Sequence, residues 1–291
     1  MNTRRQSKPD IVFSYMVYLI LALFSIATLL PFLQVLTLSM SPIEVVNSYG
    51  FHFIPTAFDL AGYRQVFHNE LIWTSYGNTI VRTALAIVLT VSLTFLGAYP
   101  LSKKTLPNRT FWTGFIVITM FFSGGLIPLY MLVKVLGLMN SIWSLILPGA
   151  ISTFLLLVVR NFVHEIPEAL EESAKMDGAN DITILIKIIL PLSMPVLATV
   201  ALYTGVYHWN AWFDSMLYIQ SEKKQVLQMI LRKIVLDGDL ASAGTETGMV
   251  AVNTQSMKLA TLIVSILPII CVYPFLQKYF VKGTLIGSVK G

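Results

Sequence analysis

Charged residues are unevenly distributed along the chain. Six stretches of at least 19 residues contain no Asp, Glu, Lys or Arg. They are 11–43, 83–102, 110–133, 135–159, 188–213 and 259–277. A helix needs about 20 mostly apolar residues to cross the hydrocarbon core of a bilayer, and its backbone must pair internally in lipid. The pattern predicts an all-α, polytopic membrane protein with six transmembrane helices.

The composition agrees with a membrane protein. Of 291 residues, 55% are hydrophobic and 12% are charged, whereas soluble domains carry about 25% charged residues. This composition excludes a disordered chain, a nucleic-acid-binding tail and most soluble enzymes. The net charge of +5 does not indicate a nucleic-acid partner, because membrane proteins gather Lys and Arg on their cytoplasmic side.

The basic residues predict the orientation of the six spans. An even number of spans places both termini on one side, which carries twelve Lys and Arg residues against seven on the other. The positive-inside tendency then makes both termini cytoplasmic. Arg82 lies near the outer end of the second span, where we expect its side chain to snorkel toward water.

These spans give a domain order for a multi-pass protein of a cell membrane. The first apolar run is too long for a signal peptide and has no small-residue cleavage site, so it is expected to stay as a span. The predicted segments are a cytoplasmic tail at 1–10, a first helix at 11–38, an extracellular segment at 39–73, a transmembrane core at 74–280 and a cytoplasmic tail at 281–291. Within the core, loop 160–187 faces inside and loop 208–256 faces outside.

The chain carries no catalytic or nucleotide-binding sequence motif. The four histidines are dispersed without ligand spacing, and the single Cys271 lies in an apolar run that favours packing. We therefore expect no enzyme activity, no metal and no cofactor in this chain. A membrane-embedded enzyme would have to rely on His208 and Asp214, which have no third partner in the sequence.

The uncharged spans also bear on the source of energy. Proton-driven carriers usually place acidic or His residues inside the membrane, and the six stretches contain no acids. Uphill transport would then draw its energy from a partner protein. A stand-alone ion-coupled secondary transporter is the alternative, since backbone carbonyls can bind sodium.

One predicted inner loop is rich in charge. Residues 160–187 hold nine of the chain's charged side chains. Pro167 suits the first turn of a helix, 168–176 is predicted to be helical, and Gly178 suits a helix C-terminus. Asn180 or Asp181 can cap a second helix. The loop is predicted to form a helix, a tight turn and a helix.

The same loop resembles the EAA motif of ABC-importer permeases. Residues 172–178 read Glu-Ser-Ala-Lys-Met-Asp-Gly, and nine residues later 188–191 read Ile-Ile-Leu-Pro. Ser173 at the middle Ala of the motif is the one departure. The resemblance implies a type I ABC permease fold and a coupling helix that docks on a cytoplasmic ATPase. The positions carried over to this coupling element are Glu168, Glu171, Glu172, Ser173, Ala174, Asp177 and Gly178.

The likeness covers about 74–291 and is similar to carbohydrate permeases of the maltose-importer type. It rests on Asn78, on 98–101 (Ala-Tyr-Pro-Leu) and on a Gly-rich tail. Run 208–214 resembles a Gram-positive branch for oligosaccharides, including aldouronate-type sugars. The resemblance implies a second permease subunit, an ATPase dimer that binds the ATP, a solute-binding lipoprotein and a sugar substrate. It also implies that the tail contacts the ATPase, with a frayed terminus as the alternative. The tail residues are Gly287, Ser288, Val289, Lys290 and Gly291.

Aromatic and polar side chains gather at the outer end of the fifth span. Aromatic faces with nearby amide and carboxylate groups suit sugar rings. The candidate solute-path residues are Tyr207, Trp209, Asn210, Trp212 and Asp214. An interfacial aromatic belt explains the same cluster. Two other features stay open in the same way: 123–125 (Ser-Gly-Gly) suits backbone approach or close helix packing, and a helix at about 222–236 presents a face to a solute-binding protein or to water.

Overall fold

The computed structural model describes residues 8–55, 57–237 and 254–288. The described residues are helices and connecting segments, with no strand among them, so the all-α prediction is confirmed. The chain divides into two compact units. The first comprises Met1–Asn69 and Lys233–Ile266, and the second comprises Glu70–Arg232 and Leu267–Gly291.

In the first unit a long apolar helix precedes two short ones. These are α1 (Lys8–Ser39), α2 (Ile43–Val46) and α3 (Ala61–His68), with the start of α14 (Thr254–Ser288). Most large side chains of α1 are exposed, which suits a helix surrounded by lipid. The Ser39 hydroxyl lies 2.8 Å from that of Tyr63, and so α1 is tied to α3.

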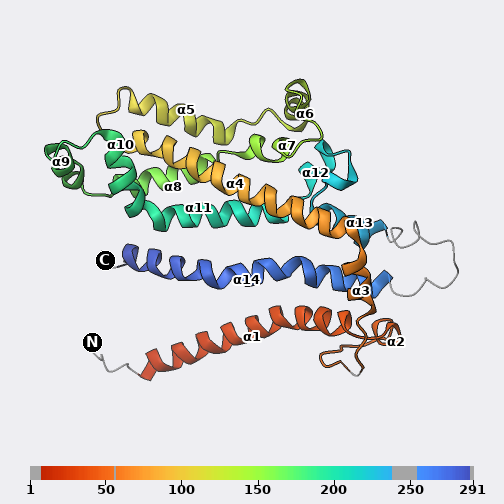
Figure 1. The fold of residues 1–291 in the computed structure, drawn as a ribbon. Coiled ribbons are helices and arrows are strands. Elements are labelled where there is room, and N and C mark those ends of the chain that lie inside the picture. The colour runs from red at the N-terminus through yellow and green to blue at the C-terminus, as the bar shows by residue number, and fades with distance from the viewer. Residues whose placement is uncertain (1–7, 56, 238–253, 289–291) are drawn as a thin grey trace. The chain divides into compact units, whose positions relative to one another are not determined.

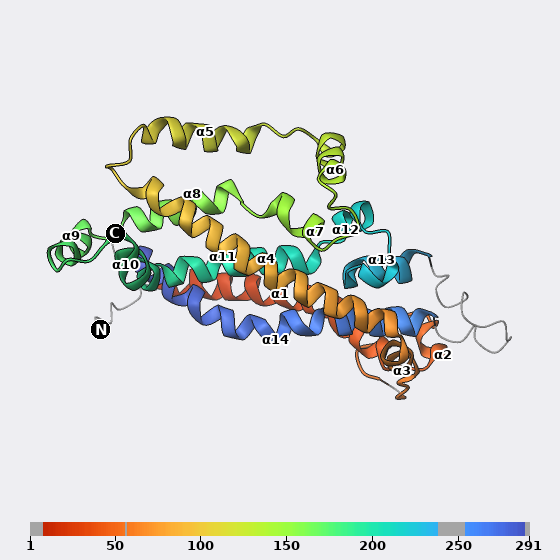
Figure 2. The ribbon, with the colours of Figure 1, turned by 45° about the horizontal axis from the view of Figure 1, so that its top comes forward.

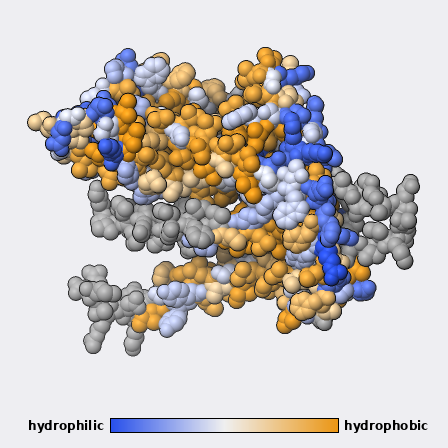
Figure 3. All heavy atoms as spheres, viewed as in Figure 1, coloured by the Kyte–Doolittle hydropathy of each residue, from blue (hydrophilic) through white to orange (hydrophobic). Residues whose placement is uncertain are grey.

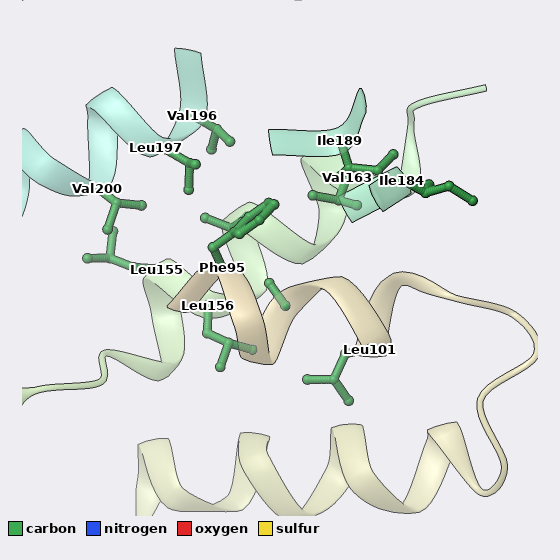
Figure 4. Close-up of a cluster of buried hydrophobic side chains, with 12 residues drawn as sticks. Phe95, Leu101, Leu155, Leu156, Val163, Ile184, Ile189, Val196, Leu197 and Val200 are labelled. Atoms are coloured by element: carbon green, nitrogen blue, oxygen red, sulfur yellow. The ribbon is translucent and has the colours of Figure 1, made fainter. Parts of the chain in front are cut away.

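The second unit is built on three packed helices. They are α4 (Glu70–Ser102), α8 (Thr153–His164) and α11 (Leu190–Asn210), and α4 lies beside both others (Figure 1, Figure 2). The core lies where they meet, with Phe95 of α4 at its centre (Figure 4). Around this ring are Leu155 and Leu156 of α8 and Val196, Leu197 and Val200 of α11.

Two of the predicted spans are not single helices. The stretch 110–133 divides into α5 (Arg109–Phe121) and α6 (Leu126–Val135), which lie at 109° to one another. Gly125 at the break has a φ of 87°, a left-handed value that Gly adopts without strain. Nothing packs within 4 Å of its missing Cβ, so close helix packing at 123–125 is not observed.

The stretch 135–159 is also interrupted. It contains α7 (Trp143–Ile146), the 3₁₀ turn η1 (Leu147–Gly149) and the first half of α8, with a bend of 54°. Pro148 lies in the turn and lacks an N–H, which removes one helical hydrogen bond there and favours the break. Three described helices are long and apolar enough to cross a membrane, or five if each bent pair is one span. The apolar part of α14, Gln255–Cys271, is shorter.

Short polar elements lie at the two ends of the second unit. One end carries α9 (Glu168–Met176), followed by α10 (Asp181–Ile184) and the π-helix η2 (Leu185–Ile189). The other carries α12 (Phe213–Tyr218), η3 (Glu222–Lys224) and the start of α13 (Leu227–Asp237). Figure 3 shows hydrophobic residues along the flank between these polar ends, as expected for a unit that spans a bilayer.

Gly62→Ala should lower the thermal stability of the chain. A Cβ at this position would lie 2.6 Å from the backbone oxygen of Ser256. Since backbone cannot move aside as a flexible side chain can, we expect a loss of about 1–3 kcal/mol, as at other overpacked sites. The measurement is thermal unfolding of the detergent-solubilised protein.

Gly77→Ala is the matched control for this prediction. Nothing lies within 4 Å of the Cβ position at Gly77, and Ala favours a helix over Gly by about 0.5–1 kcal/mol. If the Gly62→Ala protein unfolds at the same temperature as the wild type, α3 does not approach the backbone of Ser256 closely.

Candidate functional site

The charged loop folds as a helix, a tight turn and a helix, which confirms the prediction. Helix α9 begins after Pro167, and Gly178 beyond its end has a φ of 81°. The turn is closed by backbone bonds, including one of 2.9 Å from the Ala179 N–H to the Ala174 carbonyl. The Asn180 side chain accepts a 2.8 Å bond from the Thr183 N–H and so caps α10.

Two ion pairs hold α9 against the end of α4. Lys103 pairs with Glu171, and the Lys104 ammonium lies 3.0 Å from the Glu168 carboxylate. The hydrogen bond from Lys104, together with its charge, lowers the pKa of the Glu168 carboxyl. Lys103 also lies over the Tyr99 ring, 4.5 Å from its centre.

The predicted coupling residues therefore differ in their partners and in their exposure. Glu168 and Glu171 bind lysines of the same chain, and Ala174 packs against the hydrophobic core. The exposed remainder is Glu172, Ser173, Asp177 and Gly178. The coupling positions carried over from the motif leave out Met176, an apolar side chain with 89% of its surface accessible.

The predicted tail is only partly described. Gly287 and Ser288 are the last residues of α14, and Val289, Lys290 and Gly291 lie outside the described residues. Contact of this tail with an ATPase stays a prediction.

Arg82 of α4 is fully buried, so the expectation that it snorkels to water is wrong. Each of its five N–H groups donates to an acceptor. Nε donates to His208 Nδ1 at 3.2 Å, and both terminal nitrogens donate to the Asp214 carboxylate. The remaining two bonds, each 3.3 Å, go to the carbonyls of Ala211 and Leu145. A guanidinium can stay buried only with such complete pairing.

The Arg82 contacts change the interpretation of the aromatic cluster. Asp214 is committed to Arg82, and Trp209 is buried, edge-on to Tyr76 with 5.7 Å between ring centres. The Trp212 ring lies 3.8 Å from the guanidinium of Arg232.

The remaining two candidates are both on exposed surface of α11. They are Tyr207 and Asn210, whose side-chain amide donates to the Val206 carbonyl at 2.8 Å. The structure thus does not bring the five candidate solute-path residues to one surface.

Two further residues of α4 hold the outer segment. Asn78 Nδ2 donates to the carbonyls of Lys223 and Gln225 at 2.8 and 3.0 Å. The Thr79 hydroxyl accepts a 2.8 Å bond from the Leu227 N–H. We call Asn78, Thr79 and Arg82, with the segment 208–227 that they bind, the outer junction.

A polar cavity of about 300 Å³ opens beside the outer junction. Asn78, Asn140, Ser141 and Lys224 are among its lining residues, and the Lys224 ammonium donates to the Asn140 carbonyl at 3.0 Å. Among the residues that the structure describes, no group of three or more His, Cys, Asp and Glu is placed to hold a metal ion.

Apolar helices that end in a charged helix-turn-helix define a membrane-embedded transport component. Residues 1–285 match the family described as "Binding-protein-dependent transport system inner membrane component", and the chain belongs to this family. The family consists of transport permeases, so the chain is a multi-pass ABC-transporter permease and not an enzyme.

Relatives match nearly the whole chain. The Polygalacturonan/rhamnogalacturonan transport system permease protein YtcP of Bacillus subtilis is 40% identical over 285 residues, covering 96% of this chain and 99% of that protein. Protein LplC of the same organism is 40% identical over 291 residues, covering 100% of this chain and 99% of LplC. A chain from a crystal structure of a bacterial ABC transporter involved in import of the acidic polysaccharide alginate superposes with a TM-score of 0.87 and 33% identity, covering 96% of this chain and 100% of that one.

Arg82→Met should destabilise the protein strongly. The change leaves the Asp214 carboxylate and two carbonyls without their donor, and breaking a buried pair costs about 3–5 kcal/mol. Since 23% of the Asp214 side chain is exposed, water can partly solvate the carboxylate, and we expect the loss in free energy of unfolding to lie near the lower end of that range. Arg232→Met, which removes an exposed cation–π contact worth about 0.5–1 kcal/mol, is the control.

A double-mutant cycle separates the ion pair from general packing. In Arg82→Met with Asp214→Asn, the unpaired charge is gone, so part of the lost stability should return. Strictly additive losses in thermal unfolding would show that the two side chains are not coupled.

Proposed function

We propose that the chain is one permease subunit of an ATP-driven importer and is driven by a separate ATPase that binds α9. The observation that carries this proposal is the helix-turn-helix at 168–184, whose sequence fits the EAA motif. It belongs to a chain of the binding-protein-dependent transport family. A short helix closed by a Gly turn can pass on a rigid-body motion, which a flexible loop would absorb.

We propose a six-span topology with both termini in the cytoplasm. The spans are α1, α4, the bent pair α5–α6, the bent pair α7–α8, α10 to α11, and α14. This arrangement puts α9 on the cytoplasmic side, where an ATPase dimer binds the ATP, and the outer junction on the opposite side. A second permease subunit completes the pathway in a heterodimer, and an extracellular solute-binding lipoprotein delivers the substrate.

The proposed substrate is an oligosaccharide with acidic sugar units. Support comes from two similar proteins, a polygalacturonan/rhamnogalacturonan permease and a chain of an alginate importer. The outer segments also carry basic side chains, which would attract an anionic sugar. In the second unit they are Lys134, Lys223, Lys224 and Arg232.

Affinity purification from native membranes tests the assembly. Under the proposal, a second permease-like chain and an ATPase copurify, and reconstituted vesicles import labelled oligogalacturonates only with ATP and the binding protein. Import that proceeds without an ATPase would instead establish an ion-coupled carrier. If the vesicles take up neutral oligosaccharides in preference to acidic ones, the proposed acidic substrate is wrong, and the proposed ATP-driven assembly is unaffected.

Glu172→Lys should abolish uptake while membrane insertion persists. Glu172 is exposed on α9 and follows Glu168 by one helical turn, and its carboxylate suits a basic group on the ATPase. Glu165→Lys is the control, because it places the same charge change in the same loop just before α9. Wild-type uptake by the Glu172→Lys protein would refute docking through this face.

A further inference from the structure

Helix α4 is held by charged side chains at its α9 end and within its opposite half. At the α9 end, Lys103 follows the last helical residue and pairs with Glu171. Toward the other end, Arg82 binds His208, Asp214 and two carbonyls. We propose that α4 carries the displacement of α9 to the outer junction, and that Lys103 and Glu171 are the positioning residues at the input. This inference rests on the proposed coupling through α9.

The Lys103–Glu171 pair is better suited to transmit a displacement than the adjacent Lys104–Glu168 pair, because it is less exposed to water. Its side chains are 26% and 14% exposed, whereas those of Lys104 and Glu168 are 65% and 63% exposed. Water screens an exposed pair and leaves it little net energy. The Tyr99 ring beneath Lys103 adds a second contact that restricts the ammonium group.

The body of α4 is suited to transmitting motion. It is one continuous helix of 33 residues, about 50 Å long at a rise of about 1.5 Å per residue. Its inner half packs into the hydrophobic core through Phe95, Ala98 and Leu101. Two further bonds hold its last turn to α8, from Arg160 to the Leu101 carbonyl and between His164 and the Ser102 carbonyl.

The chain also joins α9 covalently to two other helices. Residues 165–167 link it to the end of α8, whereas the turn at 177–180, α10 and the π-helix η2 (Leu185–Ile189) lie between it and α11. A π-helical turn is a rare and irregular segment, commonly found at functional sites. The ion pair bypasses this segment and joins α9 to α4 through a single contact.

The outer junction converts displacement of α4 into movement of segment 208–227. Arg82 makes four bonds to this segment, and Asn78 and Thr79 add three more. If α4 shifts, these acceptors must shift with it or lose their donors, which is costly where water cannot replace them. Opening of the outer side therefore follows α4.

Charge reversal tests the input joint. Lys103→Glu and Glu171→Lys each put like charges at the contact, and we expect each to lower uptake by about tenfold, within the range typical of coupling between sites. ATP hydrolysis by the assembled transporter should persist, so the ratio of uptake to hydrolysis falls. The double variant Lys103→Glu with Glu171→Lys restores the pair and should recover most of that ratio. Lys103→Arg preserves the positive charge and should keep the wild-type ratio of uptake to hydrolysis.

Lys104→Glu is the matched control, with the same charge change on the adjacent residue in an exposed pair, and a much smaller effect is expected. The proposal would be overturned if Lys103→Glu and Glu171→Lys both kept the wild-type ratio of uptake to hydrolysis. Parallel loss of uptake, hydrolysis and membrane protein, without recovery in the double variant, would also overturn it, since that pattern marks a folding role. If Glu172→Lys leaves uptake intact, docking of α9 itself has failed. If Glu172→Lys abolishes uptake but Lys103→Glu leaves the ratio of uptake to hydrolysis at the wild-type value, the docking of α9 stands and only the role of the Lys103–Glu171 pair is refuted.

Discussion

A guanidinium buried among membrane helices must find an acceptor for every N–H group, because lipid supplies none. Arg82 meets this constraint with acceptors on four residues, three of them within 208–214, and their positions are therefore linked. The end of α11, the start of α12 and the α7 backbone all meet at one side chain. The polar outer part of the second unit is in this sense organised around a single residue of α4.

The same principle operates more weakly at the opposite end of α4. The ion pairs there are partly in water, so each one orders α9 without locking it. A tight junction at Arg82 and a weaker joint to α9 suit a helix that receives motion near one end and delivers it toward the other. The family membership and the EAA-like loop give this asymmetry a direction, from the ATPase side to the solute side, under the proposed function.

Local signals in the sequence were sufficient for the charged loop. Pro167, Gly178 and Asn180 act on their immediate neighbours, so helix 168–176 and its turn were predicted at their observed bounds. The bend after α5 was missed, because an uncharged composition says that a stretch can enter lipid but not that it is straight. The Arg82–Asp214 pair was also missed, since the two residues are far apart in sequence and no local pattern joins them. A lone arginine among apolar residues was the one available signal.

Glu168 and Glu171 of α9 pair with lysines of the same chain, whereas Glu172 and Met176 are exposed. Under the proposed function, the contact of α9 with its own permease and its contact with the ATPase are therefore made by different side chains. A substitution at Glu172 or Met176 can then alter the ATPase contact and leave both ion pairs in place.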